Sequence, residues 1–382
     1  MKKSLLSFMA VASASALALS GCAEPPSTTT PTPGASTSGA SSSASSAPSA
    51  TASSGGAASD FLACMVSDAG GFDDKSFNET AYNGLMKAKD ELGIQTKQIE
   101  SNAEGEYAGN VQSMIDAKCN IIITVGFALA TATEAAAKQN PDVMFTIVDN
   151  ASFEGVDNAR GLIFNTAQPA FMAGYAAAAM SKSGTVGTFG GAKYPTVTVF
   201  MDGFAQGVKY YNEAKKGSVK LIGWDEAAQD GQFVGGNNPF GDIPGGKNTA
   251  ATLIAQGADI IMPVAGPAGL GALQAAQESG GKVNAVWVDT DGYISAPEFG
   301  PQIITSVTKA MDVAVFDSIK SAIDGSFSSD PFVGTLENEG VALAPFHDFE
   351  SKMPEGLAAE LDQIKADIIS GKIEITSPSQ PK

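Results

Sequence analysis

The chain has 382 residues, of which 41 are acidic and 23 are lysine or arginine, so its formal net charge is −18 at neutral pH. Negative charge in such excess repels nucleic acids and anionic lipid surfaces, and neither is expected as a partner. The single histidine and the three cysteines do not lie at metal-ligand spacing, so no metal and no other cofactor is predicted.

Residues 1–21 have the pattern of a bacterial signal peptide. Two lysines follow the first methionine, and residues 4–19 are apolar or small and uncharged. This stretch is shorter than the roughly 20 apolar residues of a membrane span. It runs into Leu-Ser-Gly-Cys, and small residues before a cysteine are typical of a lipobox. We therefore expect cleavage before Cys22 and anchoring by several acyl chains on the outer face of the cytoplasmic membrane. The alternative is an ordinary secretory signal with an incidental cysteine.

Residues 22–59 are predicted to be a lipidated cysteine followed by a flexible tether. Residues 23–59 are serine, threonine, alanine, proline and glycine, with one acidic residue. Such a composition buries too little apolar surface to offset the entropy lost on ordering. The roughly 320 residues that follow suit two domains rather than one.

Short apolar runs then alternate with stretches of helical periodicity. In the first half, strands are expected at 61–67, 97–100, 121–125 and 143–148, and helices at 77–93, 107–117 and 130–139. In the second half, strands are expected at 185–189, 220–224, 260–264 and 283–288, and helices at 170–181, 202–215, 248–256 and 270–279. A last strand at 303–307 and a last helix at 312–323 are assigned to the first half. Unbroken apolar strands between helices are typical of parallel sheets covered on both faces.

This order predicts an α/β protein with the type I periplasmic-binding-protein fold, in which two doubly wound parallel-sheet lobes are joined by a hinge. The N-terminal lobe is expected to comprise 60–167 and about 293–324, and the C-terminal lobe 168–292 and about 325–382. Ligands of such sheets bind outside the carboxyl ends of the strands, which would face each other across a cleft.

Two cysteines remain once Cys22 is assigned to the lipid. Cys64 lies in the first predicted strand and Cys119 just before the third, and these strands would be neighbours in a doubly wound sheet. A disulfide is compatible with an oxidising compartment. Two buried free thiols are the alternative.

The segment after the first strand has the composition of a ligand-binding loop. Asp68 stands at the carboxyl end of the strand, and two glycines follow that allow the backbone to approach a ligand closely. Phe77 and Asn78 begin the next helix. A capped turn with a core phenylalanine is the alternative interpretation.

Residues 65–84 resemble the signature of the basic membrane protein family, which includes purine nucleoside receptor lipoproteins of the PnrA type. Matching stretches follow in order at 126–127, 170–174, 186–191, 200–207, 257–261, 265–271, 288–291 and 305–309. The resemblance covers about 61–323. It implies a non-enzymatic solute-binding lipoprotein of an ABC importer, which acts as a monomer and delivers a nucleoside, most readily a purine nucleoside, to a membrane permease.

The resemblance also implies a set of ligand-binding residues. They are Asp68, Phe77, Asn78, Gly126, Phe127, Thr131, Phe200, Trp224, Gly266, Asp289, Asp291 and Lys309. Aromatic rings such as Phe77 and Phe200 would stack on a base. Asp289 or Asp291 would accept hydrogen bonds from ribose hydroxyls, and Lys309 would donate one.

The chain departs from the family pattern near the base. Thr131 stands where many members carry an aspartate, and residues 230–246 look like an insertion rich in glycine, asparagine and proline. The alternatives are a sugar or another small ligand in the same fold, a cell-surface hydrolase or nucleosidase, and an adhesive surface lipoprotein. An enzyme is disfavoured because no nucleophile with a base, metal cluster or carboxylate dyad is visible.

Overall fold

The structure is a computed structural model that describes residues 59–381. The predicted signal peptide, Cys22 and the tether up to residue 58 lie outside the described residues. None of the helices between residues 59 and 381 reaches the length and hydropathy that a bilayer span requires.

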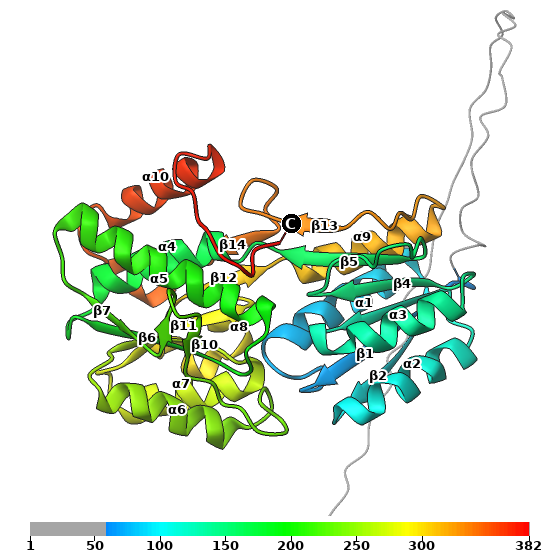
Figure 1. Cartoon of the computed structure of the whole chain (residues 1–382), viewed down its shortest axis with the longest axis horizontal. Helices are drawn as coiled ribbons and strands as arrows, with labels where there is room; N and C mark the ends of the chain where they lie inside the picture. The colour runs from blue at the N-terminus through cyan, green and yellow to red at the C-terminus, as the bar shows by residue number, and fades with distance from the viewer. Residues whose placement is uncertain (1–58, 382) are drawn as a thin grey trace, which may run out of the picture. The chain divides into compact units, whose positions relative to one another are not determined.

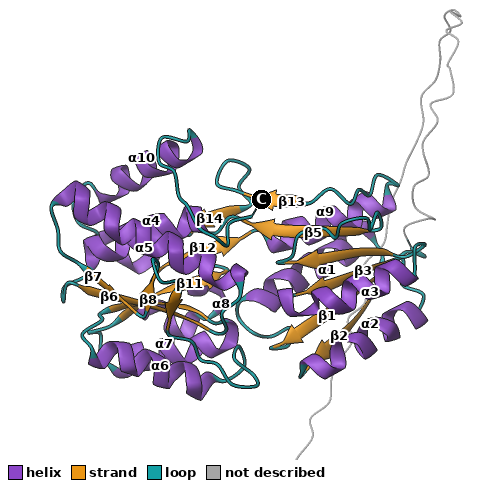
Figure 2. Cartoon of the chain, viewed as in Figure 1, coloured by secondary structure: helices purple, strands orange, loops and turns teal. Residues whose placement is uncertain are grey.

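The first lobe is built on a six-stranded sheet in the order β13-β5-β4-β3-β1-β2, in which all the pairs are parallel (Figures 1 and 2). Its strands are β1 (Leu62–Ala69), β2 (Gln95–Ser101), β3 (Ile121–Val125), β4 (Met144–Val148), β5 (Ala159–Phe164) and β13 (Phe332–Gly334). Its helices are α1 (Phe77–Leu92), α2 (Tyr107–Asp116), α3 (Ala130–Gln139) and α9 (Met311–Ile323).

Side chains of β1 alternate between two buried faces, because successive residues of a strand point to opposite sides of the sheet. Ala63 and Met65 belong to the hydrophobic cluster that includes α1 and α9. Cys64 and Val66 belong to the cluster that includes α2 and α3. The unbroken apolar run thus results from helices on both faces.

The second lobe is built on a six-stranded sheet in the order β14-β12-β11-β10-β6-β7, in which only β14 is antiparallel. Its strands are β6 (Thr185–Gly190), β7 (Lys220–Ile222), β10 (Ile260–Val264), β11 (Asn284–Asp289), β12 (Ile303–Lys309) and β14 (Val341–Leu343). A separate hairpin pairs β8 (Trp224–Asp225) with β9 (Asp230–Gly231). The helices of the second lobe are α4 (Ala167–Met180), α5 (Pro195–Lys215), α6 (Ile243–Ala255), α7 (Gly269–Glu278), α8 (Gly292–Ser295) and α10 (Leu357–Ile369).

Short 3-10 helices occur in both lobes. They are η1 (Glu104–Glu106) and η2 (Phe127–Leu129) in the first lobe, and η3 (Gly266–Ala268), η4 (Pro297–Gln302) and η5 (His347–Lys352) in the second.

Helices α4 and α5 pack backbone to backbone. A Cβ atom on Gly203 would lie 2.3 Å from the carbonyl oxygen of Ala167, and one on Gly207 would lie 2.0 Å from that of Phe171. Glycine is therefore required at both positions of the contact. This packing fixes α5, whose first residues take part in the site below.

The predicted α/β class with two parallel-sheet lobes is confirmed, and two lobe boundaries are corrected. The strand predicted at 303–307 was assigned to the first lobe, but β12 pairs with β11 and β14 in the second sheet. The short α8 and η4 return the chain to the same sheet, and it crosses to the first lobe only after Lys309. The helix predicted at 312–323 does pack in the first lobe, against α1. Residues from about 325 are predicted in the second lobe, but β13 pairs with β5 in the first sheet, and only the chain from β14 onward belongs to the second lobe.

A disulfide joins Cys64 in β1 to Cys119, two residues before β3 begins at Ile121. Their Cα atoms lie 5.9 Å apart. Of the two alternatives that the sequence leaves open, the structure contains the bridge. It ties β1, the strand that carries Asp68 near its carboxyl end, to the α2–β3 connection.

Candidate ligand-binding site

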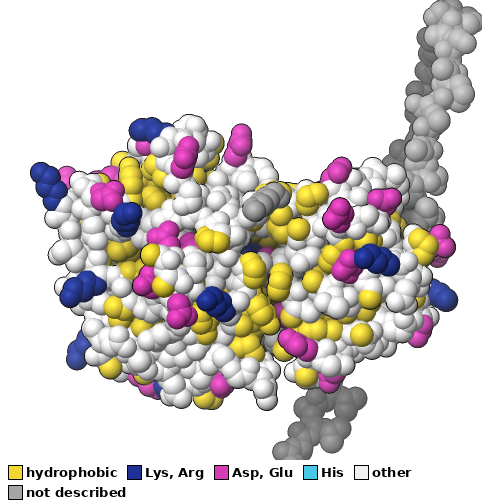
Figure 3. All heavy atoms as spheres, in the orientation of Figure 1, with side chains coloured by type: hydrophobic (Ala, Val, Ile, Leu, Met, Phe, Trp, Pro, Cys, Tyr) yellow, Lys and Arg dark blue, Asp and Glu magenta, His cyan; other side chains and the backbone are white. Residues whose placement is uncertain are grey.

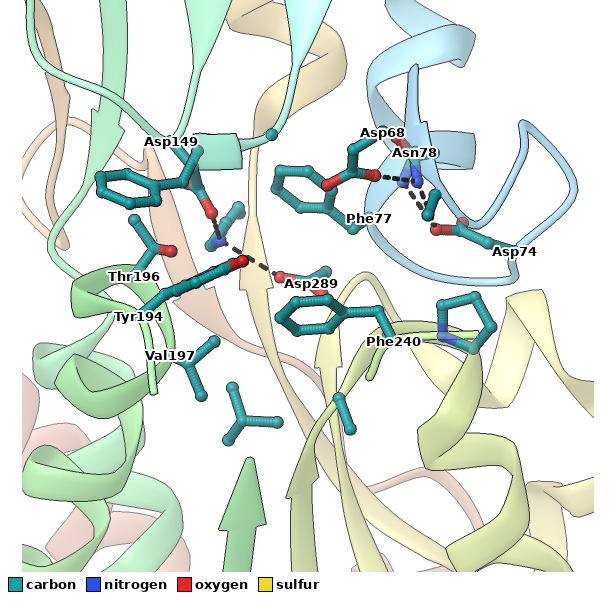
Figure 4. A pocket seen from close by; sticks show the side chains of 18 of the residues that line it. Asp68, Asp74, Phe77, Asn78, Asp149, Tyr194, Thr196, Val197, Phe240 and Asp289 are labelled. Atoms are coloured by element: carbon teal, nitrogen blue, oxygen red, sulfur yellow. Dashed lines mark hydrogen bonds and ion pairs between the residues drawn. The ribbon is translucent and has the colours of Figure 1, made fainter. Parts of the chain in front are cut away.

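A pocket of about 550 Å³, partly open to solvent, lies where the carboxyl ends of the two sheets meet (Figure 4). The first lobe contributes the ends of β1, β3 and β4 and the start of α1. The second lobe contributes the start of α5, residue Phe240, the loop after β10 and the ends of β11 and β12. Both lobes thus form this pocket from the strand ends where doubly wound sheets bind ligands.

Most of the residues that the sequence predicts for the ligand line this pocket. They are Asp68, Phe77, Asn78, Gly126, Phe127, Phe200, Gly266, Asp289 and Lys309.

A buried charge cluster forms part of the pocket wall. The Nζ atom of Lys309 lies 2.7 Å from Oδ2 of Asp149 and 3.3 Å from Oδ1 of Asp289. All three residues are buried, with exposures of 4%, 7% and 6%. Burial opposes the charge of Lys309, but the two carboxylates raise its pKa above the usual value. Lys309 is therefore a cation at neutral pH.

Aromatic rings surround this ammonium. Its Nζ atom lies 4.9 Å from the ring centroid of Phe77, 5.1 Å from that of Phe200 and 5.9 Å from that of Phe164. Cation–π attraction at such distances is worth about 0.5–2 kcal/mol per favourable ring. Rings from both lobes therefore help to hold the cation where the lobes meet.

The two aspartates of the cluster have an unusual backbone. Asp149 has φ of 64° and Asp289 has φ of 72°, both in the left-handed region that non-glycine residues avoid. Each stands at the end of its strand, after β4 and in the last position of β11. Ser76 Oγ donates to Oδ2 of Asp289 at 3.0 Å. Backbone strain of this kind is concentrated at functional sites.

A second group of polar side chains lies at the start of α1. Asp74 is buried and accepts hydrogen bonds from the backbone N–H groups of Ser76, Asn78 and Glu79, so it caps the helix. Asn78 Nδ2 donates to Oδ1 of Asp68 at 3.0 Å and to Oδ2 of Asp74 at 3.3 Å. The amide of Asn78 therefore separates two carboxylates.

Both of these carboxyl groups have raised pKa values. Burial raises the pKa of Asp68 to about 8. The hydrogen bond from Asn78 lowers this pKa by less, and the nearby aspartates raise it further. Burial also raises the pKa of Asp74 to about 6, despite three backbone donors. Near neutral pH, Asp68 thus exchanges a proton and is able either to donate or to accept a hydrogen bond.

Gly126 makes room for Asp68. Its φ is 118°, and a Cβ atom there would lie 2.2 Å from Oδ2 of Asp68. No side chain is compatible with both conditions, so glycine at the end of β3 keeps the carboxylate in the pocket wall.

Three further rings line the pocket next to each other. The ring centroid of Tyr194 lies 5.4 Å from that of Phe127 and 5.8 Å from that of Phe240. Phe127 belongs to the first lobe, and the other two belong to the second. Together with Phe77 and Phe200 they give the pocket aromatic surface from both lobes, which suits a flat ring system.

Three predicted site residues lie elsewhere. Thr131 is exposed on α3, beyond the lining of the pocket. Trp224 belongs to the separate hairpin, and its Nε1 donates to Oδ1 of the buried Asp202 at 2.9 Å. Asp291 caps α8 through the backbone N–H of Tyr293 and contacts His347, with 2.7 Å between Oδ2 and Nε2. Of the two aspartates considered for the sugar, only Asp289 lines the pocket.

Sequence reasoning missed several lining residues, notably Asp74, Asp149, Tyr194 and Phe240. Asp149 follows a predicted strand directly, so the rule that selected Asp68 would also have found it. Phe240 carried no usable signal because it lies within the segment 230–246 that looked like an insertion. Within residues 59–381, no group of three or more histidine, cysteine, aspartate and glutamate residues is arranged to hold a metal ion.

Two parallel-sheet lobes with a pocket between their strand ends are the architecture of periplasmic solute-binding proteins. The solute-binding protein of an ABC transporter system from Aeropyrum pernix K1 shares this fold, with a TM-score of 0.71 and 24% identity over 83% of this chain and 94% of that one. Residues 61–377 match the model of the Bmp family, described as ABC transporter substrate-binding protein PnrA-like, and the chain belongs to this family.

Sequence similarity to members of this family extends over most of the chain. Basic membrane protein A2 of Borrelia garinii subsp. bavariensis is 31% identical over 310 residues, which span 80% of this chain and 85% of the relative. The ABC transporter nucleoside-binding protein BmpA of Lactococcus lactis subsp. cremoris is 28% identical over 394 residues, which span 99% of this chain and 100% of the relative. The chain is thus a substrate-binding protein of an ABC transporter, as the resemblance in its sequence implies.

Proposed function

We propose that the protein binds a nucleoside, preferably a purine nucleoside, in the interlobe pocket and presents it unchanged to a membrane permease. The observation that carries this proposal is the combination of aromatic surface from both lobes with hydrogen-bonding groups at two separate ends. Asp68 and Asn78 form one end, and Lys309 with Asp149 and Asp289 forms the other. A nucleoside has the same division into a flat base and a hydroxyl-rich sugar. The Lactococcus lactis relative is named for binding this ligand class.

The charge cluster is suited to the sugar. Carboxylates of Asp149 and Asp289 accept hydrogen bonds from vicinal hydroxyls, and the ammonium of Lys309 donates to a sugar oxygen. The pocket has four carboxyl side chains and one lysine among its lining residues. This balance favours neutral hydroxyl groups over phosphate, because a phosphate would face uncompensated negative charge.

The base edge would meet Asp68 and Asn78. Among the described residues, Oδ1 of Asn78 has no hydrogen-bond partner although it is buried, so it offers an acceptor to a ligand donor. Asp68 is beside it and supplies either a donor or an acceptor, since its pKa is about 8. With Thr131 on the surface of α3, we infer that these two residues read the base in place of the aspartate that many relatives carry.

We further propose that ligand binding closes the two lobes around the pocket. Each lobe supplies rings and charges to the ligand, so the closed state gains contacts that the open state lacks. In this proposal Cys22 carries the lipid anchor, residues 22–59 form the tether, and a monomer on the outer face of the membrane delivers the solute to the permease.

Calorimetric titration of the purified protein tests the ligand. Adenosine, guanosine, inosine, uridine, adenine and ribose are each added, and the unfolding temperature is recorded in parallel. We expect saturable binding of a purine nucleoside with weaker or absent binding of free base and free ribose. Stabilisation should rise with ligand concentration, by about 2.7 kcal/mol at a hundredfold excess over Kd.

Paired variants test the site. Asp289→Asn should weaken nucleoside binding, whereas Asp291→Asn, two residues away but outside the pocket, should leave the affinity unchanged. If the protein binds a free sugar but no nucleoside, the nucleoside proposal is wrong and the alternative of a sugar ligand is supported. Release of free base during incubation, detected by chromatography, would instead support a nucleosidase.

A further inference from the structure

The segment Thr376–Pro381 lies along α5 and is bound by a row of polar side chains on that helix. Thr198, Asp202 and Gln206 stand at every fourth position and therefore on one face of α5. Gln206 makes two hydrogen bonds with the backbone of Thr376. Its Nε2 donates to the carbonyl oxygen at 2.5 Å, and its Oε1 accepts from the backbone N–H at 3.2 Å.

The other two members of the row bind the next residues of the segment. Ser377 Oγ donates to Oδ2 of Asp202 at 2.5 Å, and the hydroxyls of Ser379 and Thr198 lie 2.7 Å apart. Since residue numbers rise along the segment while they fall along the row, the segment runs toward the first turn of α5. That turn lines the ligand pocket.

The central anchor is a fully buried carboxylate. Oδ1 of Asp202, which is 0% exposed, also accepts from Trp224 Nε1 at 2.9 Å and from Gln229 Nε2 at 2.8 Å. A buried carboxylate is stable only when its acceptor sites are filled. Ser377 is thus part of the hydrogen-bond network around this carboxylate, which fixes the course of the segment.

The segment ends at a second cavity of about 750 Å³, partly open to solvent. Ser379, Gln380 and Pro381 form one part of its wall, and Asn150 and Phe164 of the first lobe form another. Phe127, Asp149, Thr196 and Lys309 line both this cavity and the ligand pocket. A single layer of side chains therefore separates the two.

The second cavity adjoins the sugar end of the pocket. In Figure 4, Asp149 and Thr196 lie together on one side of the ligand pocket. Asp68 and Asn78 lie on the opposite side. A nucleoside whose base meets Asp68 thus directs its sugar toward the shared wall.

The lining of this cavity is mainly apolar, and among the described residues it carries no free charge. Its charged side chains are Asp149 and Lys309, which pair with each other at 2.7 Å. The other polar groups are hydroxyls and amides, of Asn150, Thr196, Ser379 and Gln380, and the remaining lining residues are aromatic, aliphatic or proline. Such a surface accepts an uncharged group with apolar and hydrogen-bonding parts, and it rejects an anion.

We propose that this second cavity is a subsite for an uncharged substituent on the sugar of the bound nucleoside, and that Ser379 and Gln380 determine its specificity. The inference rests on the proposed nucleoside function. It assigns the segment Thr376–Pro381 to ligand selection, together with the buried network that positions it.

Three probes that differ only at the sugar 5′ position test this subsite by calorimetry on the full chain. They are adenosine, the neutral thioether 5′-deoxy-5′-methylthioadenosine and the anionic adenosine 5′-monophosphate. We expect the thioether to bind about tenfold more tightly than adenosine, because the added methyl and sulfur leave water. The monophosphate should bind more weakly than adenosine by about a hundredfold, because it faces Asp149.

Two variants close or loosen the subsite without touching the ligand pocket. Ala151 is exposed and lines only the second cavity, so Ala151→Phe should fill it from the first lobe. Ser377→Ala should release the segment from Asp202. Either change should abolish the preference for the thioether while the adenosine affinity changes by less than about threefold. Ala135→Phe, at an exposed position of α3 outside the lining of both cavities, is the matched control and should keep the preference.

The outcomes separate the two proposals. Adenosine binding with no thioether preference in the unchanged protein overturns the subsite and leaves the nucleoside function intact. A preference that survives both Ala151→Phe and Ser377→Ala overturns it as well. No binding of any nucleoside overturns the proposed function, and the subsite falls with it.

Discussion

Replacing Lys309 by methionine should destabilise the protein far more than the loss of a surface ion pair. Methionine keeps most of the side-chain volume, so packing against the surrounding rings is largely preserved. The charge, however, disappears from between Asp149 and Asp289, at 2.7 Å and 3.3 Å from the Nζ atom. Two buried carboxylates are then left without a cation.

The magnitude follows from this arrangement. Removing one partner of a buried ion pair typically costs about 3–5 kcal/mol, because the remaining charge stays buried without compensation. The lost cation–π contacts add to this, at about 0.5–2 kcal/mol for each well-placed ring. We therefore expect a decrease of at least about 3 kcal/mol in the free energy of unfolding at pH 7. Lys247→Met, which removes a surface pair with Glu278, should cost less than about 1 kcal/mol.

The cost should also depend on pH in a defined direction. Burial already raises the pKa of Asp149, and loss of the ammonium, which opposes that shift, raises it further. An acid whose folded-state pKa exceeds its unfolded value of about 3.9 destabilises the fold above the folded pKa and not below the unfolded one. The difference between the variant and the parent protein should therefore shrink as the pH falls from 7 toward 4.

Urea unfolding of the parent protein, Lys309→Met and Lys247→Met at several pH values between 4 and 8 measures this effect. Equal destabilisation by the two variants at pH 7 would refute the buried pair as a structural element. A difference that stays constant over the whole range would refute the assignment of the cost to uncompensated carboxylates.

Two further predictions concern Asp68. Burial raises its folded-state pKa to about 8, so the parent protein should lose stability as the pH rises between about 4 and 8. Asp68→Asn should remove this loss, and urea unfolding should therefore show a larger gain in stability for the variant at pH 9 than at pH 5. Equal gains at the two pH values would contradict the raised pKa. Gly126→Ala should displace the same carboxylate and weaken nucleoside binding by about tenfold or more. Gly155→Ala is its matched control, since φ is also positive (70°) but nothing lies within 4 Å of the new Cβ atom, and equal affinities of the two variants in calorimetry would show that Asp68 does not need this space.

Much of the fold could be predicted because the strongest local patterns coincide with the elements. The run Ile121–Val125 is buried along its whole length and forms a strand with the predicted bounds. The helix Ala130–Gln139 also has its predicted bounds. Local pattern does not specify the sheet that a strand joins, however. The strand Ile303–Lys309 is almost entirely buried, as it would be in either sheet, and only its pairing with β11 and β14 shows which lobe it joins.

The start of α5 was missed for a physical reason. The helix begins at Pro195 and continues through threonine and valine residues, whose branched side chains favour strands in isolation. Proline is nevertheless well suited to the first position of a helix, because its missing N–H has no partner there. Tertiary packing on α4 outweighs the propensity, and Tyr194 and Thr196 thereby enter the pocket.

The expectation that ligands bind at the carboxyl ends of strands identified part of the site. The structure shows why the same expectation failed at Trp224. Asp68 and Asp289 end strands inside the two large sheets, so their side chains reach the cleft. Trp224 is the last residue of the strand predicted at 220–224, but Gly223, with φ of 87°, breaks that strand, and β8 pairs with β9 outside the main sheet. A strand end faces the ligand only if the strand belongs to the sheet that forms the cleft. Trp224 instead donates to the buried Asp202, and through that carboxylate it belongs to the network that holds the segment beside the second cavity.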